Sequence, residues 1–134
     1  MKRAAWTGAN ALMLLAFLFS VTVQYNDPDP VRWMAIYGAA AVVCGLELAR
    51  RTRGSLPAAV ALVALGWAAT IAPRVLGKVR FGDMFAEFEM HNVGVEESRE
   101  MYGLVLVALW MMLVWLAATR RRAQLTRPPA VPQG

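Results

Sequence analysis

Four apolar stretches divide this 134-residue chain, at residues 4–23, 33–49, 56–72 and 101–118. A helix rises about 1.5 Å per residue, so each stretch comes close to the roughly 30 Å hydrocarbon core of a bilayer. Lipid cannot hydrogen-bond to the backbone, and apolar stretches of this length therefore cross as helices. The sequence predicts an all-α, polytopic membrane four-helix bundle, formed by residues 1–122 as a single transmembrane domain.

Composition agrees with a membrane protein and excludes a nucleic-acid partner. The chain is 58% hydrophobic and only 17% charged, and its charged residues fall in clumps between the apolar stretches. The net charge is +5, but the basic residues flank apolar stretches and do not line a polar face. Membrane lipid is a sufficient explanation for such basic clusters.

The first apolar stretch is interpreted as a retained helix. A cleaved signal peptide has an apolar region of about 7–15 residues before a small-x-small cleavage site. Residues 4–23 are longer than that region, and residues 20–24 (Ser-Val-Thr-Val-Gln) offer no convincing cleavage site.

The charges flanking the four stretches predict the topology. With the N-terminus inside, the inner segments hold nine of the fourteen basic residues, and the outer segments hold eight of the nine acidic ones. Lys and Arg are enriched on the cytoplasmic side, so both termini are expected in the cytoplasm. The short loops and the Ala/Arg-rich composition suggest a bacterial inner membrane. The Pro-rich residues 123–134 are expected to form a disordered cytoplasmic tail.

A connection of nearly thirty residues joins the third and fourth stretches and is too long for a simple turn. Its first half carries Phe81, Met84, Phe85 and Phe88 at i, i+3, i+4 and i+7. This spacing predicts a short amphipathic helix lying in the headgroup layer between spans 3 and 4.

Two polar clusters carry the unusual chemistry of the outer side, at residues 24–30 and 96–100. Asp29 precedes Pro30 and is expected to be a helix N-cap, while Asn26 or Asp27 can close an Asx-turn. Arg99 can clamp Asp27 or a neighbouring carboxylate, so the first hypothesis is a structural latch between two outer loops. The candidate ligand, ion or latch residues are Gln24, Asn26, Asp27, Asp29, His91, Glu96, Glu97, Arg99 and Glu100.

The second hypothesis is a binding site for a divalent cation or a small polar ligand. Clustered carboxylates and amides suit Ca²⁺, and His91 with Glu89 or Glu96 would suit a transition metal. The metal-ligand candidates are Asp27, Asp29, Glu96, Glu100 and His91. A carboxylate pair can also act as acid and base, but the chain has no nucleophile motif, phosphate loop or HExxH zinc motif. Haem is not expected with a single histidine.

Within the apolar stretches, a few polar and aromatic residues have specific expectations. Glu47 is expected to pair with Arg50 or Arg51, one turn further on. Asn10 and Gln24 fall on nearly the same stripe of the first stretch and are expected to hydrogen-bond to other helices. Trp33 and Tyr37 stand where an interfacial aromatic belt would place them, and Pro73 is expected to end the third helix.

Three motifs resemble those of the transmembrane protein 220 family. They are Asn10-x-Leu12-Met13; Gln24-x-Asn26-Asp27-Pro28-Asp29 with Trp33 and Tyr37 beyond it; and Glu96-Glu97-x-Arg99-Glu100-x-x-Gly103-Leu104. The resemblance extends from Asn10 to about Trp110. It implies a small four-helix membrane protein of a kind found in bacteria and eukaryotes, and it implies no established biochemical activity. A small membrane scaffold or accessory subunit, with other membrane subunits as partners, is therefore the leading functional hypothesis.

Overall fold

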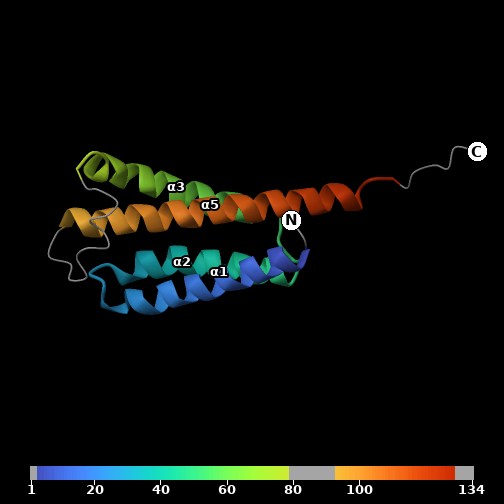
Figure 1. Ribbon diagram of the computed structural model, residues 1–134, viewed down its shortest axis with the longest axis horizontal. Coiled ribbons are helices and arrows are strands. Elements are labelled where there is room, and N and C mark those ends of the chain that lie inside the picture. The colour runs from blue at the N-terminus through green and yellow to red at the C-terminus, as the bar shows by residue number, and fades with distance from the viewer. Residues whose placement is uncertain (1–2, 79–92, 129–134) are drawn as a thin grey trace, which may run out of the picture.

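The computed structural model describes residues 3–78 and 93–128, and within these residues the chain is entirely helical apart from turns (Figure 1). The elements are α1 (Arg3–Val23), the 3₁₀ turn η1 (Gln24–Asn26), α2 (Pro30–Leu48), α3 (Leu56–Val75) and α5 (Val93–Leu125). The four α-helices are each long and apolar enough to cross a membrane, which confirms the predicted all-α class. The expected amphipathic helix around residues 81–88 lies outside the described residues.

Two helices extend beyond their predicted ends. α3 ends at Val75, one residue beyond the stop expected at Pro73-Arg74. A proline in the last turn removes only one intrahelical hydrogen bond, and the Leu76 N–H still donates to the Ala72 carbonyl at 2.9 Å. α5 continues to Leu125, into the first residues of the stretch expected to be a disordered tail.

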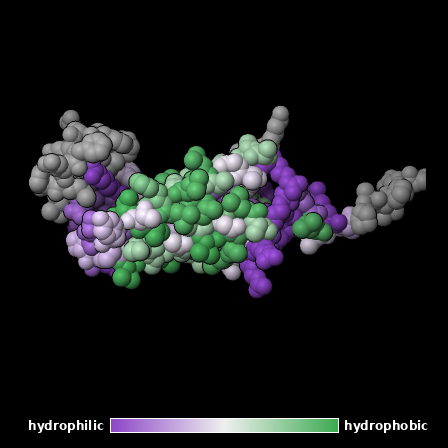
Figure 2. Space-filling view, turned by 90° about the horizontal axis from the view of Figure 1, so that it is seen from below, coloured by the Kyte–Doolittle hydropathy of each residue, from purple (hydrophilic) through white to green (hydrophobic). Residues whose placement is uncertain are grey.

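The helices form two antiparallel hairpins that lie side by side, α1 with α2 and α3 with α5 (Figure 1). Residues 24–29 and the start of α5 lie at one end, which we call the acidic end. The N-terminus, the turn after α2 and the end of α5 lie at the opposite end, which we call the basic end. Figure 2 shows hydrophobic surface along the middle of the molecule and hydrophilic residues at both ends, as a membrane-spanning bundle requires.

An aromatic ladder joins the two hairpins near the acidic end. The ring of Tyr37 stacks between those of Phe17 and Trp33, with centroid distances of 6.4 Å on each side. Trp33 in turn stacks on Trp67 of α3 at 4.4 Å. Because Trp33 and Tyr37 are buried in the bundle, their interpretation as a lipid-facing belt is wrong. Stacking between the aromatic rings of the two hairpins turns both side chains inward.

Gly103 allows α5 to approach Tyr37 closely. A Cβ built on Gly103 would lie far inside van der Waals contact with the Tyr37 hydroxyl oxygen. The Tyr37 ring has little room to move, because aromatic rings flank it on both faces. A residue without a side chain is therefore required at this position of α5.

We expect Gly103→Ala to lower the free energy of unfolding by about 1–3 kcal/mol, because the added methyl overpacks the joint between the hairpins. Gly66→Ala is the matched control, since nothing lies within 4 Å of a Cβ there and alanine favours a helix. Thermal unfolding in a mild detergent measures both. Equal melting temperatures for the two variants would contradict this close approach.

Candidate functional site

The turn at the acidic end presents Asp27 towards the second hairpin. Gln24–Asn26 form the single 3₁₀ turn, and Asp27 follows in an extended conformation, at φ −72° and ψ 147°. The Asp29 backbone N–H donates to Asp27 Oδ1 at 3.0 Å, so Asp27 closes the expected Asx-turn. The turn fixes the Asp27 backbone and leaves its second carboxylate oxygen to face other groups.

Asp29 occupies the N-cap position of α2, with Pro30 at the start of the helix as expected. Its carboxylate, however, makes no capping hydrogen bond and forms an ion pair with Arg32, three residues on. A charged guanidinium is a stronger donor than a backbone N–H, which explains the difference from the expected side-chain cap. Asp29 thus serves α2 and does not join the group around Asp27.

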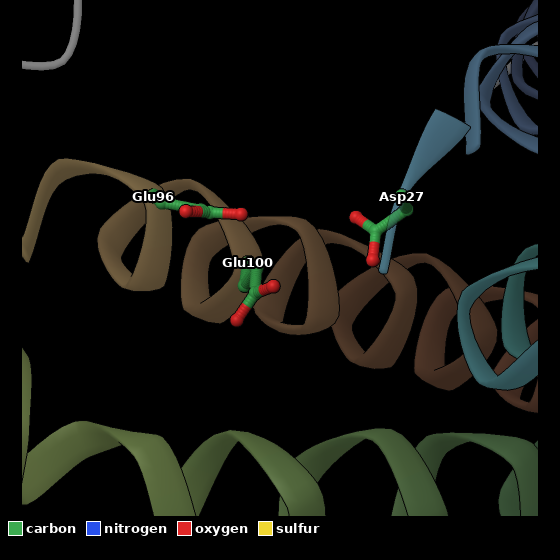
Figure 3. Close-up of side chains that lie close together, drawn as sticks. All are labelled: Asp27, Glu96 and Glu100. Atoms are coloured by element: carbon green, nitrogen blue, oxygen red, sulfur yellow. The ribbon is translucent and has the colours of Figure 1, made fainter. Parts of the chain in front are cut away.

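Two further carboxylates come from α5 and meet Asp27. Glu96 and Glu100 are four residues apart, so they project from the same face of the helix. One carboxylate oxygen from each of Asp27, Glu96 and Glu100 can be chosen so that all three lie within 4.8 Å of one another. Figure 3 shows Asp27 reaching in from the first hairpin towards the two glutamates of α5. We call these three residues the carboxylate cluster.

The carboxylate cluster borders a cavity of about 180 Å³, which we call the cluster cavity. Gln24 and Arg99 add an amide and a guanidinium to its lining, and Trp33 and Tyr37 add aromatic surface. All three carboxylates are partly buried. Partly buried charges interact more strongly than exposed ones. The three carboxylates therefore repel one another, and a positively charged group nearby would stabilise them.

The structure brings together five of the nine residues that the sequence singles out, namely Gln24, Asp27, Glu96, Arg99 and Glu100. Asp29 faces a neighbouring cavity, and Asn26 is exposed. Glu97 pairs with Arg74, whose Nε donates to Glu97 Oε1 at 2.8 Å. His91 lies outside the described residues.

A second polar centre, which the sequence did not predict, lies at the basic end. Glu47 is 5% exposed, and both of its carboxylate oxygens bond to Arg121 of α5, at 2.7 and 3.1 Å. The expectation that Glu47 pairs with Arg50 or Arg51 is therefore wrong. Arg50 adopts a positive φ of 57° in the turn that ends α2, while the end of α5 packs beside Glu47. The cation that pairs with Glu47 thus comes from α5 and not from the turn that follows α2.

Three more residues complete this Glu47 network. The Thr52 hydroxyl donates to Glu47 at 2.7 Å, and the Trp6 indole N–H donates at 3.3 Å. Arg122, next to Arg121, donates to the Thr52 carbonyl at 3.1 Å. The sequence does contain a signal for this network: Glu47 is the one acid within an apolar stretch, and a triplet of arginines follows the fourth stretch. Spacing along the chain could not show that the two pair.

Asn10 adds a deeper link between the helices. Its amide nitrogen donates to the Cys44 carbonyl at 2.9 Å, and its amide oxygen accepts from the Trp110 indole at 3.2 Å. The Trp110 ring also stacks on Trp6 at 5.6 Å. The predicted interhelical role is confirmed for Asn10, whereas Gln24, on the same stripe, lines the cluster cavity.

The two ends differ chemically. At the basic end both carboxylate oxygens of Glu47 accept hydrogen bonds, from Arg121, Thr52 and Trp6. Such a network stabilises a fold. The cluster cavity instead gathers like charges around an open space, which is an arrangement that can accept a cation.

These features define a small, four-helix integral membrane protein with a polar cavity between two hairpins at one end. Residues 16–116 match the sequence model of the family described as Transmembrane family 220, helix, so the chain belongs to this family, in agreement with the resemblance seen in its motifs. The matched range includes the whole carboxylate cluster. No solved structure matches the chain.

Proposed function

We propose that this protein is a small membrane scaffold or accessory subunit, and that the carboxylate cluster joins its two hairpins at the acidic end. The observation that carries this proposal is the meeting of Asp27, from the first hairpin, with Glu96 and Glu100 of the second. A group held between the hairpins fixes their relative position, and with it the surface that the acidic end offers to another subunit.

Like charges cannot by themselves hold the hairpins together. Two carboxylates 4.8 Å apart repel by about 3 kcal/mol at an effective dielectric constant near 20. The cluster therefore acts as a joint only with positive charge in or beside the cavity. Arg99 lines the cavity and supplies one such charge.

If the joint presents a surface to a partner subunit, removing its charges should release that partner. We expect a tagged parent protein, extracted in mild detergent, to co-purify with one membrane protein in constant stoichiometry. Asp27→Asn combined with Glu96→Gln should lower the yield of that partner at least tenfold. Quantitative mass spectrometry of the purified material measures it.

Glu97→Gln is the control for this experiment, because Glu97 pairs with Arg74 and is not one of the three residues of the cluster. It should retain the partner. A parent that purifies alone, or a double variant that keeps its partner in full, would contradict the subunit proposal.

A second candidate function is the binding of a divalent cation by the cluster, and the oxygen spacing favours it. Ca²⁺ holds oxygens at 2.3–2.6 Å, so two ligands of one ion lie at most about 5 Å apart. The oxygens of the carboxylate cluster satisfy this limit. Gln24 offers an amide oxygen at the same cavity, and water can complete the six to eight ligands of Ca²⁺.

For this candidate we expect Ca²⁺ to raise the melting temperature of protein first treated with EDTA, since an ion that binds only the folded state stabilises it. Free Ca²⁺ at 100 times its dissociation constant would add about 2.7 kcal/mol. Glu96→Gln should remove most of the shift, and Glu97→Gln should keep it. A parent whose melting is unchanged by EDTA and by added Ca²⁺ or transition metals would contradict the cation site.

The charges of the described residues support one orientation in the membrane. The basic end carries Arg3, Arg50, Arg51, Arg53, Arg120, Arg121, Arg122 and Arg127. Because Lys and Arg near span ends favour the cytoplasmic side, the basic end and both termini face the cytoplasm in this proposal. The cluster cavity then opens on the outer side, and a bacterial inner membrane fits the composition.

A further inference from the structure

An apolar groove runs between α2 and α3 on the membrane-embedded part of the molecule. Its volume is about 440 Å³, and its walls are apolar apart from Arg32. Three alanines leave the space open, Ala35 and Ala39 on α2 and Ala59 on α3. The aromatic ladder closes the hairpins against each other nearer the acidic end, but beyond it the alanines of α2 and α3 leave the space unfilled.

The groove is short compared with the thickness of the membrane. On α2 its lining runs from Arg32, the third residue, to Ala39, near the middle of this 19-residue helix. On α3 the lining runs from Trp67 back to Ala59, the fourth residue of that helix, a distance of about 12 Å. The groove thus leads from the acidic end of α2 towards the basic end of α3 and covers less than half of the roughly 30 Å hydrocarbon core.

These dimensions suit a spanning helix poorly. The lining extends over about 12 Å of α3, little more than two turns, so a spanning helix would meet the groove over less than half of its length. One acyl chain, by contrast, can lie along the apolar walls with its headgroup at the charged end of the groove.

At its acidic end the groove meets a charged cavity of about 210 Å³, which we call the mouth. Arg32 and Trp67 line both the groove and the mouth, so the two spaces adjoin. Arg74 of α3 provides a second guanidinium at the mouth. The acids of the mouth are Asp27, Asp29, Glu96 and Glu100. Apolar walls at membrane depth and charged walls at the interface suit an amphiphile.

We propose that this groove and mouth bind one phospholipid with a primary amine in its headgroup, such as phosphatidylethanolamine. One acyl chain lies in the groove between α2 and α3. The phosphate lies against Arg32 and Arg74, and the ammonium donates hydrogen bonds to the carboxylates of the mouth.

The charges of the mouth select this headgroup. Four acids and two arginines line it, so its net charge is negative and it repels a purely anionic lipid. A phosphate still has donors available, because a guanidinium carries five N–H groups. Arg32 and Arg74 each hold one ion pair, and their side chains remain 62% and 57% exposed. A choline headgroup has no N–H to give the carboxylates, whereas an ethanolamine headgroup has three.

The lipid site shares Asp27, Glu96 and Glu100 with the cation candidate, but it needs no metal. Measurements in EDTA therefore test lipid binding alone. A protein that does not respond to Ca²⁺ would not contradict the lipid proposal. In the same way, loss of the lipid would leave the Ca²⁺ response in place.

The test uses the full chain, purified in mild detergent with EDTA and studied by native mass spectrometry and thermal unfolding. Phosphatidylethanolamine, phosphatidylcholine and phosphatidylglycerol with identical acyl chains are added to delipidated protein. We expect one bound phosphatidylethanolamine per chain and a larger rise in melting temperature than with either other lipid. Equal rises with all three, or no one-to-one adduct, would overturn the proposal.

Matched variants on one helix locate the site. Ala59→Leu fills the groove and should lower the bound fraction at least fivefold, while Ala69→Leu, at an exposed position on another face of α3, should leave it unchanged. Arg32→Gln removes a phosphate contact that the three lipids share, so it should weaken the binding of all three with the groove intact. Equal binding by the two leucine variants would overturn the assignment, and so would a second protein or a second copy displaced by Ala59→Leu in place of lipid.

Discussion

The ion pair between Glu47 and Arg121 is the interaction on which the arrangement of the two hairpins depends. A carboxylate that is almost fully buried among apolar helices is tolerated only with complete partners. Arg121 supplies a bidentate partner from the other hairpin, and Trp6 and Thr52 fill the remaining acceptor sites. The pair therefore sets the positions of α2 and α5 along the membrane normal, because sliding either helix would leave a buried charge alone.

This register decides what meets at the opposite end. Twenty residues separate Glu47 from Asp27, and twenty-one separate Arg121 from Glu100. α2 rises about 1.5 Å per residue only as far back as Pro30, and the non-helical residues before it carry the chain on to Asp27, which meets Glu100 at the acidic end. The Asx-turn and the aromatic ladder then hold Asp27 against α5. The ionic network at one end thus helps to bring three like charges together at the other, where a cation or an amine headgroup would reduce their repulsion.

The sequence predicts the helical fold of this protein well, because membrane thickness and backbone hydrogen bonding allow few other structures. The apolar stretches gave the four helices, and the charge pattern put residues 24–30 and 96–100 on the same side, where the structure also has them. Interhelical partners were harder to predict. Glu47 had basic neighbours one turn away, and only packing of α5 against α2 selects Arg121.

The sequence also did not show whether a side chain faces lipid or the interior of the bundle. Trp33 and Tyr37 are expected from the sequence to form an interfacial belt, but whether a ring faces lipid or the bundle depends on which helix lies beside it. The groove between α2 and α3 is a further case. Alanines at 35, 39 and 59 look suited to close helix packing, yet here they line a space. Small residues permit close approach and do not ensure it.

A double-mutant cycle on Glu47→Gln and Arg121→Gln tests most directly whether this pair joins the hairpins. The free energy of unfolding is measured in mild detergent for the parent, both single variants and the double variant, with Arg120→Gln, an exposed neighbour, as control. Each single variant should lose about 2 kcal/mol or more, the double variant should lose little beyond either one, and the control should change by less than about 0.5 kcal/mol. Additive losses, within about 0.5 kcal/mol, would show that the two side chains act independently and would contradict the account.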